Sequence, residues 1–442
     1  MVLRTFAATA ALALCAVAAR PGPAQASGLV VCRPDEARKA ELGQSRRALV
    51  VGNGAYRPAA PGSGRRRGFD PLESPPIDAE RMVEALCALG FEVRALRDAD
   101  ADALRAAVAA FRRDNEADSA REQVRVVYYS GHGVEVASAN YIVPVSAAVE
   151  TARDEGVGFP DIYDAAAAGA GPGSGRRALK VLLFDACRSW LRGEPRLGGL
   201  AQPQQGAADT VVGYATVPGE VAASSPGGQP SRWTAALLRS IRQPGLELGE
   251  FFGRVHEEVR EGSHGHQRPA TFEARAGAFY FNPAPRIVWR VNAVDDQLRV
   301  RVAGTDVFQS RVREASSGEM PFDVLQTGGG ASGPPARRYI DTPFEVLLHN
   351  QRTNRGGNSW GRREGWNYSL DLLIGTAPAL QMRSAGEPGD RAPPDERWGA
   401  EFVVQRGTIR IDREAGTVTA VDIAAPEGTF GSCTVAGTRR PC

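Results

Sequence analysis

An alternation of two hydrophobic patterns between Arg46 and Phe281 constrains the fold more than any other feature of the chain. Short apolar runs typical of buried strands are RALVVG, FEVRAL, VRVVYYSG, ALKVLLFD, TVVGYATV and GAFYF. Longer segments with helical spacing lie between them, such as PPIDAERMVEALCALG and RWTAALLRSIR. Strands that alternate with helices predict an α/β fold, in which a mostly parallel sheet carries helices on both faces.

The pattern changes beyond Pro283. Short alternating strands are then separated by Gly, Pro, Asn and Asp turns, without a helical period. We therefore predict a first domain over residues 45–283, a linker at Asn282–Arg286, and an all-β, sandwich-like accessory domain over residues 284–442. Three tryptophans of this second domain could line a protein- or carbohydrate-binding surface, although burial in the core is the commoner fate of tryptophan: Trp360, Trp366 and Trp398.

Residues 1–26 have the pattern of a secretory signal peptide. Arg4 precedes an apolar stretch from about Phe6 to Ala19, and the small residues Ala24–Ala26 form a cleavage site. The apolar stretch is shorter than the roughly 20 residues that a membrane-spanning helix needs. We therefore expect a periplasmic or secreted protein with no membrane partner once the signal is removed.

The composition is that of an ordinary globular protein. The chain has 442 residues, of which 43% are hydrophobic and 24% are charged. Its formal net charge of +2 is too small to indicate nucleic acid or an anionic membrane as a partner. Nearly all the basic residues are arginine, as expected of a bacterial protein from a GC-rich genome; Lys39 and Lys180 are the lysines.

Five of the six cysteines lie outside the predicted signal peptide. In an oxidising compartment, Cys433 could pair with Cys442 and Cys32 with Cys87, which leaves Cys187 as the odd thiol. No Cys/His cluster has the spacing of metal ligands, so we predict no metal site.

Cys187 and His132 each follow a predicted strand. VRVVYYSGHG ends near His132, and LKVLLFDAC ends at Cys187. If the two strands are neighbours in a parallel sheet, the thiol and the imidazole emerge at the same edge. An imidazole can take the proton of a thiol, hold the thiolate as an ion pair, and later protonate a leaving amine. The glycines beside His132 would let a substrate backbone approach and present an amide to an oxyanion.

Each feature also has an ordinary structural interpretation. A single cysteine is commonly a small core residue, and Gly-His-Gly is commonly a turn. The coincidence of both groups at the ends of two predicted strands favours a catalytic pair over either alternative.

The order of these segments resembles the caspase-like cysteine peptidases, which include metacaspases and bacterial orthocaspases. The resemblance covers about Arg46 to Phe281 and rests on RRALVVGNGAYR, LESPPIDAERMVEALCALGFEV, VYYSGHGVEVASANYIVPV and VLLFDACRS, followed by VVGYATVPGEVA and RWTAALLRSI. It implies a caspase-like fold with Cys187 as the nucleophile and His132 as the general base and acid. The amides of Gly133 and Cys187 would form the oxyanion hole.

The resemblance further implies an acidic specificity pocket. Asp78 and Asp185 match the pocket acids of metacaspase-like members, which cleave after arginine or lysine. The region SSPGGQPSRW should form a substrate-binding loop, although it departs from the pattern common in the family. A buried carboxylate favours a cationic partner. The alternative for Asp78 is an acid at a helix amino terminus that interacts with the helix dipole. No organic cofactor is implied, but calcium activation is a property of some relatives.

The sequence therefore predicts a secreted cysteine endopeptidase whose substrates carry Arg or Lys before the cleaved bond. The enzyme could also process itself, because PGSGRRRGF and GAGPGSGRRALK offer arginines in Gly/Ser-rich stretches expected to be exposed, flexible loops. The expected cuts follow Arg67, Arg176 or Arg177. The alternative function is a catalytically silent scaffold whose β-domain binds protein or carbohydrate.

Overall fold

The computed structural model describes residues 29–34, 36–57, 68–136, 139–188, 208–217, 228–294, 297–312, 314–327, 338–349, 368–383, 401–424, 432–435 and 438–441. The predicted signal peptide, Arg67, the three tryptophans named above and Cys442 lie outside these ranges. Among the helices within them, none is long and apolar enough to span a bilayer.

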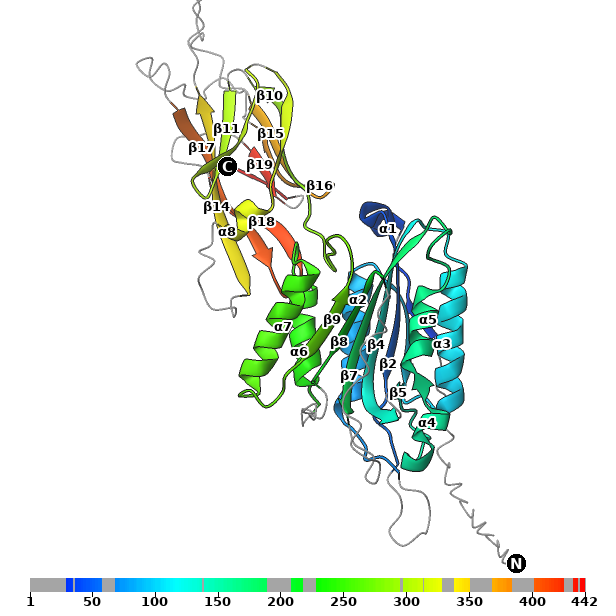
Figure 1. The fold of residues 1–442 in the computed structure, drawn as a ribbon. Helices are drawn as coiled ribbons and strands as arrows, with labels where there is room; N and C mark the ends of the chain where they lie inside the picture. Colours follow the sequence, from blue (N-terminus) through cyan, green and yellow to red (C-terminus); the bar gives the residue numbers. More distant parts are fainter. Residues whose placement is uncertain are drawn as a thin grey trace, which may run out of the picture.

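The first unit is built on one large sheet (Figure 1). Its main path, β1-β3-β2-β4-β7-β8-β9, has five parallel central strands and an antiparallel strand at each edge. The bounds are β1 Leu29–Cys32, β2 Ser45–Gly52, β3 Glu92–Arg97, β4 Glu122–Val136, β7 Arg177–Arg188, β8 Thr210–Tyr214 and β9 Ala270–Ala274. Two short strands, β5 (Ala139–Ile142) and β6 (Val157–Gly158), extend β4 off this path.

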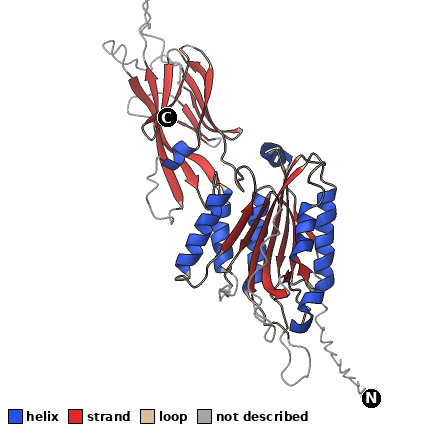
Figure 2. Ribbon diagram, in the orientation of Figure 1, coloured by secondary structure: helices blue, strands red, loops and turns tan. Residues whose placement is uncertain are grey.

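Helices cover both faces of this sheet, as predicted (Figures 1 and 2). The side chains of α2 (Ser74–Ala88), α6 (Arg232–Ile241) and α7 (Leu248–Gly262) pack in one core, and those of α3 (Ala101–Glu116) and α5 (Phe159–Ala167) pack in another. Residues of β2 alternate between the two cores, with Val50 in the first and Leu49 in the second. Short helices complete the unit: α1 Glu36–Leu42, η1 Val149–Thr151 and α4 Ala152–Glu155.

The second unit consists of two antiparallel sheets packed around one core, which confirms the predicted sandwich. The first sheet has the order β13-β10-β15-β16-β19-β20 and the second β12-β11-β14-β17-β18. Their bounds are β10 Ile287–Val294, β11 Gln297–Val302, β12 Thr305–Gln309, β13 Ser316–Met320, β14 Tyr339–His349, β15 Tyr368–Ile374, β16 Ala377–Arg383, β17 Glu401–Asp412, β18 Thr417–Ala424, β19 Ser432–Val435 and β20 Thr438–Pro441. One short helix, α8 (Asp323–Thr327), interrupts the predicted all-β pattern.

The run GAFYF is not a strand, contrary to the prediction. The last strand of the sheet is β9, a few residues earlier, and Phe279 and Phe281 are buried in the core with α7. The buried guanidinium of Arg46 donates hydrogen bonds to the carbonyl oxygens of Tyr280 and Phe281. These carbonyls are therefore satisfied by a side chain rather than by a neighbouring strand.

A disulfide joins Cys32 to Cys87, which confirms one of the two pairs expected from the sequence. Their Cα atoms lie 6.2 Å apart, and the bond ties edge strand β1 to the carboxyl end of α2. The other expected pair, Cys433 with Cys442, stays a prediction because Cys442 lies outside the described residues.

Candidate active site

The strands that carry His132 and Cys187 are neighbours, although β4 does not end at His132 as predicted but continues to Val136, where it pairs with β5. β4 and β7 pair in parallel, and in their register the Cα of His132 lies directly opposite that of Cys187. Adjacent strands are about 4.8 Å apart, so the backbones of the two residues lie side by side near the carboxyl ends of the central strands. Gly133 is the next residue along the ladder, opposite Arg188. The side chains of Cys187 and Arg188 lie outside the described structure.

The imidazole of His132 is fixed through one of its two nitrogens. Nε2 lies 2.8 Å from the carbonyl oxygen of Asp70, which can only accept a hydrogen bond, so Nε2 carries the proton. Nδ1 is buried and has no hydrogen-bond partner among the described residues. Burial lowers the pKa of His132, and the Asp70 carbonyl opposes this effect in part. The ring is therefore neutral near pH 7, with a basic lone pair on Nδ1.

Two buried tyrosines hold the backbone of His132. The amide of His132 donates to the Tyr56 hydroxyl at 3.0 Å, and the Tyr129 hydroxyl donates to the His132 carbonyl at 2.6 Å. The ring of Tyr56 also meets the imidazole edge-on, with centroids 4.6 Å apart. A Cβ on Gly131, whose φ is +155°, would lie 2.6 Å from the Tyr129 hydroxyl oxygen. Internal packing thus requires a glycine at this position.

The loop after β2, which contains GNGAY, positions Tyr56. The Asp98 carboxylate accepts hydrogen bonds from the amides of Gly54 and Ala55, each at 2.8 Å. The buried Asn53 side chain accepts from the Ala99 amide and donates to the Val143 carbonyl. In the sequence this motif stands out only through the family resemblance, and its role as the support of His132 was not predicted. The signal was a polar Asn and a Gly directly after a buried strand, where turns are common.

The two predicted pocket acids, Asp78 and Asp185, come together although they are 107 positions apart in the sequence. Ser231 contacts both: its amide donates to Asp78 Oδ1 at 2.7 Å, and its hydroxyl donates to Asp185 Oδ2. The hydroxyl of Ser130 donates to Asp78 Oδ2 at 2.8 Å, and that of Thr234 donates to Asp185 Oδ2 at 2.7 Å. Asp78 lies beyond the first turn of α2 and makes tertiary contacts with Ser130 and Ser231, which favours the pocket assignment over the helix-dipole alternative.

Burial raises the pKa of both acids. It is the largest effect on Asp78, the nearby charge of Asp185 adds to it, and the pKa of Asp78 rises to about 8. Burial also raises the pKa of Asp185, against the hydrogen bonds from Ser231 and Thr234. Two buried carboxyl groups that hinder one another's ionisation favour a cationic partner, whose charge would restore both carboxylates.

The roles of Ser231 and Ser130 in the acid cluster were not predicted from the sequence. Ser231 caps α6, and its side chain accepts a hydrogen bond from the Thr234 amide. A serine directly before the predicted helix RWTAALLRSIR is a helix-start signal and marks the amino end of α6. Its contact with both acids depends on tertiary structure, which no local pattern reveals.

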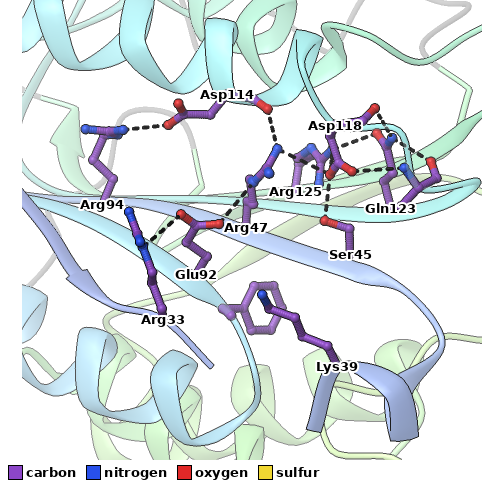
Figure 3. A network of polar contacts seen from close by, with 12 residues as sticks. Arg33, Lys39, Ser45, Arg47, Glu92, Arg94, Asp114, Asp118, Gln123 and Arg125 are labelled. Atoms are coloured by element: carbon purple, nitrogen blue, oxygen red, sulfur yellow. Dashed lines mark hydrogen bonds and ion pairs between the residues drawn. The ribbon is translucent and has the colours of Figure 1, made fainter. Parts of the chain in front are cut away.

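A separate polar network lies at the amino ends of the central strands, the end of the sheet opposite to His132 (Figure 3). Asp118 accepts hydrogen bonds from Ser45 and from the fully buried Arg125, each at 2.6 Å, and pairs with Arg47 at 3.3 Å. A hollow of about 380 Å³ lies nearby, lined by residues of α1 and of the amino ends of β2 and β3. The charges of Asp118 are matched by arginines, so the network stabilises the fold at the end of the sheet away from His132.

The stretch Gly169–Lys180 is exposed at residues 172–175, as expected, but it forms a hydrogen-bonded turn that lies away from His132. Gly171 and Arg176 form a backbone bridge, and the Ser174 hydroxyl donates to the Gly171 carbonyl at 2.7 Å. Arg176 donates to the Asp118 carbonyl at 2.6 Å. Because this turn precedes β7, it lies at the amino edge of the sheet, whereas Cys187 lies near the carboxyl end of the strand.

Comparison with protein families identifies the first unit. The caspase domain model matches residues 45–280, which is more than half of the chain. The chain belongs to the caspase domain family of cysteine peptidases. His132, Cys187 and both acids lie within the caspase domain match, and the sandwich lies outside it.

Caspase-1 from Spodoptera frugiperda is one solved structure similar to this caspase-domain chain. The two are 14% identical, the match covers 55% of this chain and 91% of that chain, and the TM-score is 0.37. No curated protein matched the chain. Within the described residues, no group of three His, Cys, Asp or Glu side chains could hold a metal ion.

Proposed function

We propose that the chain is a cysteine endopeptidase that cleaves peptide bonds after arginine or lysine. The observation that carries the proposal is the register that sets His132 opposite Cys187, with Nε2 of the imidazole anchored and Nδ1 left as the basic nitrogen. A thiol next to a basic, water-excluded imidazole is the arrangement that nucleophilic cysteine catalysis needs.

In the proposed reaction, His132 Nδ1 takes the thiol proton and the Cys187 sulfur attacks the substrate carbonyl carbon. The amides of Gly133 and Cys187 donate hydrogen bonds to the oxyanion. The proton on His132 then passes to the leaving amine, and an acyl-enzyme remains. Water, activated by the same imidazole, hydrolyses the thioester and regenerates the thiol.

The proposed specificity rests on Asp78 and Asp185. A guanidinium or ammonium group near these acids would form charge-assisted hydrogen bonds in a buried setting, where such bonds are strong. A neutral side chain would leave the carboxyl groups without a cation, and an acidic side chain would be repelled.

The proposal includes secretion to an oxidising compartment. It is supported by the signal-peptide pattern of residues 1–26 and by the Cys32–Cys87 disulfide. Sequencing the amino terminus of the exported protein checks this part: a mature chain that begins at Ser27 is expected.

The test of the proposed function is cleavage of matched peptide amides with arginine, lysine, citrulline or aspartate before the scissile bond, with and without calcium. We expect arginyl and lysyl amides to be cleaved, citrullinyl amides to be cleaved at least about tenfold less efficiently, and aspartyl amides least. Absence of turnover on all four substrates with correctly folded protein would favour the scaffold alternative.

A further inference from the structure

Helix α6 connects the acid cluster to the sandwich. At its amino end, Ser231 donates to Asp78 and Asp185, and Thr234 in the first turn donates to Asp185. Its carboxyl end is capped by Arg242. The ten residues of α6 span about 15 Å, so a shift of one end is passed to the other.

Three hydrogen bonds of the linker residue Asn282 and one packing contact join the carboxyl end of α6 to the second unit. The Asn282 side chain donates to the Arg242 carbonyl at 2.7 Å and to the Gly416 carbonyl, in the turn between β17 and β18, at 3.0 Å. The Asn282 carbonyl accepts from the Gly245 amide at 2.9 Å. A Cβ built on Gly245 would lie 2.9 Å from the ring of Phe322, so this aromatic side chain packs directly on the loop after α6.

The closest of these approaches is that of Gly416. A Cβ at this position would lie 2.4 Å from the Arg242 carbonyl oxygen and 3.1 Å from Asn282 Nδ2. The Arg242 carbonyl belongs to the backbone at the end of α6, and the Asn282 amide group donates two hydrogen bonds. Neither group can therefore move away from a Cβ at position 416 without breaking a contact. The β17–β18 turn therefore fixes where α6 ends.

We propose that the sandwich positions the specificity pocket through α6, with Asn282 and Gly416 as positioning residues that act on Ser231. This inference rests on the proposed function, because it assigns the acids to the pocket that holds the substrate's basic side chain. Among the described residues, Ser231 and Thr234 connect α6 to the two acids and to Tyr128 of β4, and α6 makes no hydrogen bond to His132. Disturbing the end of α6 should therefore impair recognition of arginine more than the chemical step.

The decisive variant is Gly416→Ala, with Gly304→Ala as its matched control. Both glycines lie in the second unit with a left-handed backbone, φ +68° and +82°, so alanine strains the backbone alike at the two positions. A Cβ on Gly304 meets no atom within 4 Å, whereas one on Gly416 meets the end of α6. Asn282→Asp is a milder second variant that keeps the shape but replaces the two donated hydrogen bonds by repulsion between oxygens.

Two readouts separate this inference from the proposed function. The first is amide hydrogen exchange of the segment 229–235, which needs no enzymatic activity. We expect Gly416→Ala and Asn282→Asp to accelerate exchange at Ser231 and Thr234 by about tenfold, the equivalent of one lost hydrogen bond, and Gly304→Ala to leave it unchanged. Unchanged exchange in folded Gly416→Ala and Asn282→Asp proteins would overturn the coupling, whatever the enzyme cleaves.

The second readout is the ratio of kcat/KM for an arginyl amide to that for a citrullinyl amide. The ratio should fall about tenfold in Gly416→Ala, through KM, and stay within twofold of wild type in Gly304→Ala. Accelerated exchange with an unchanged ratio would overturn the claim that α6 positions the pocket. A wild-type protein that cleaves neither amide would instead reject the proposed function and leave the exchange result to decide the coupling.

Discussion

The Nε2 of His132 lies 2.8 Å from the carbonyl oxygen of Asp70, so the catalytic candidate is oriented by the backbone of a residue 62 positions earlier. A carbonyl oxygen accepts hydrogen bonds and cannot donate one. It therefore selects the tautomer with the lone pair on Nδ1. The pair of His132 and Cys187 needs no third charged side chain for this purpose.

The first prediction concerns the proposed pair. His132→Ala should lower kcat/KM by about a hundred- to ten-thousandfold, because it removes the group that transfers the proton. Cys187→Ala should abolish turnover, because it removes the nucleophile. The double variant should be no worse than Cys187→Ala, since the two groups act as a unit. Circular dichroism checks that each variant folds. Turnover by Cys187→Ala equal to that of wild type would reject the mechanism.

The second prediction concerns Tyr56, whose hydroxyl accepts a hydrogen bond from the His132 amide. Tyr56→Phe should lower kcat by about tenfold while KM for the arginyl amide stays within twofold, because the acid cluster is untouched. Tyr163→Phe is the control: Tyr163 lies in α5, and its ring faces Lys180 near the amino end of β7. Equal effects of the two substitutions on kcat would show that Tyr56 has no positioning role.

The third prediction is a pH dependence that follows from the raised pKa of Asp78, about 8. Below that pH the carboxyl group of the free protein is protonated, and binding a guanidinium requires it to lose the proton. KM for the arginyl amide should therefore fall as pH rises from 6 to 8, by up to about tenfold per unit, and level off above 8. KM for the citrullinyl amide should change little.

The same pKa has a consequence for stability, with the sign fixed by linkage. Between the unfolded value, 3.8, and the folded value, about 8, the folded state binds the Asp78 proton more tightly. This group's contribution to the free energy of unfolding is therefore greatest at low pH and decreases as pH rises towards 8. Asp78→Asn should reduce that decrease, as measured by urea denaturation at pH 5 and pH 8. An identical pH dependence in wild type and variant would contradict the raised pKa.

The fourth prediction concerns self-processing. Arg176 and Arg177 lie in or next to a hydrogen-bonded turn at the sheet edge away from His132, and cleavage there would require local unfolding. If the enzyme cuts itself, mass spectrometry should therefore find a terminus at Arg67 and none at Arg176 or Arg177. The Cys187→Ala protein should stay whole. Fragments that end at Arg176 in fresh wild-type protein would show that the turn opens readily.

Much of the fold was predictable because local patterns determine it. The alternation of strand and helix periods predicted the parallel sheet, and the loss of the helical period after Pro283 predicted the sandwich. The run GAFYF misled because its aromatic residues suit a strand, but their backbone carbonyls bind Arg46, more than 230 positions away. A contact between such distant residues leaves no local trace in the sequence.

The site residues that lie on strands could be predicted from the sequence, whereas those contributed by loops that meet in three dimensions could not. Sequential strands placed His132 and Cys187 at one edge, and the family resemblance singled out Asp78 and Asp185. Ser231 and the Asp70 carbonyl were missed because their contribution depends on which loops meet in three dimensions. A backbone carbonyl carries no residue-type signal at all.

The central claim is that Cys187 is a nucleophile served by an acidic pocket, and affinity labelling tests it most directly. The protein is incubated with a peptidyl acyloxymethyl ketone that ends in arginine or, as the matched control, in citrulline, and the modified residue is located by mass spectrometry. We predict a single label on Cys187, formed at least about tenfold faster with arginine and lost in His132→Ala. Labelling of another residue, or equal rates with the two reagents, would contradict the account.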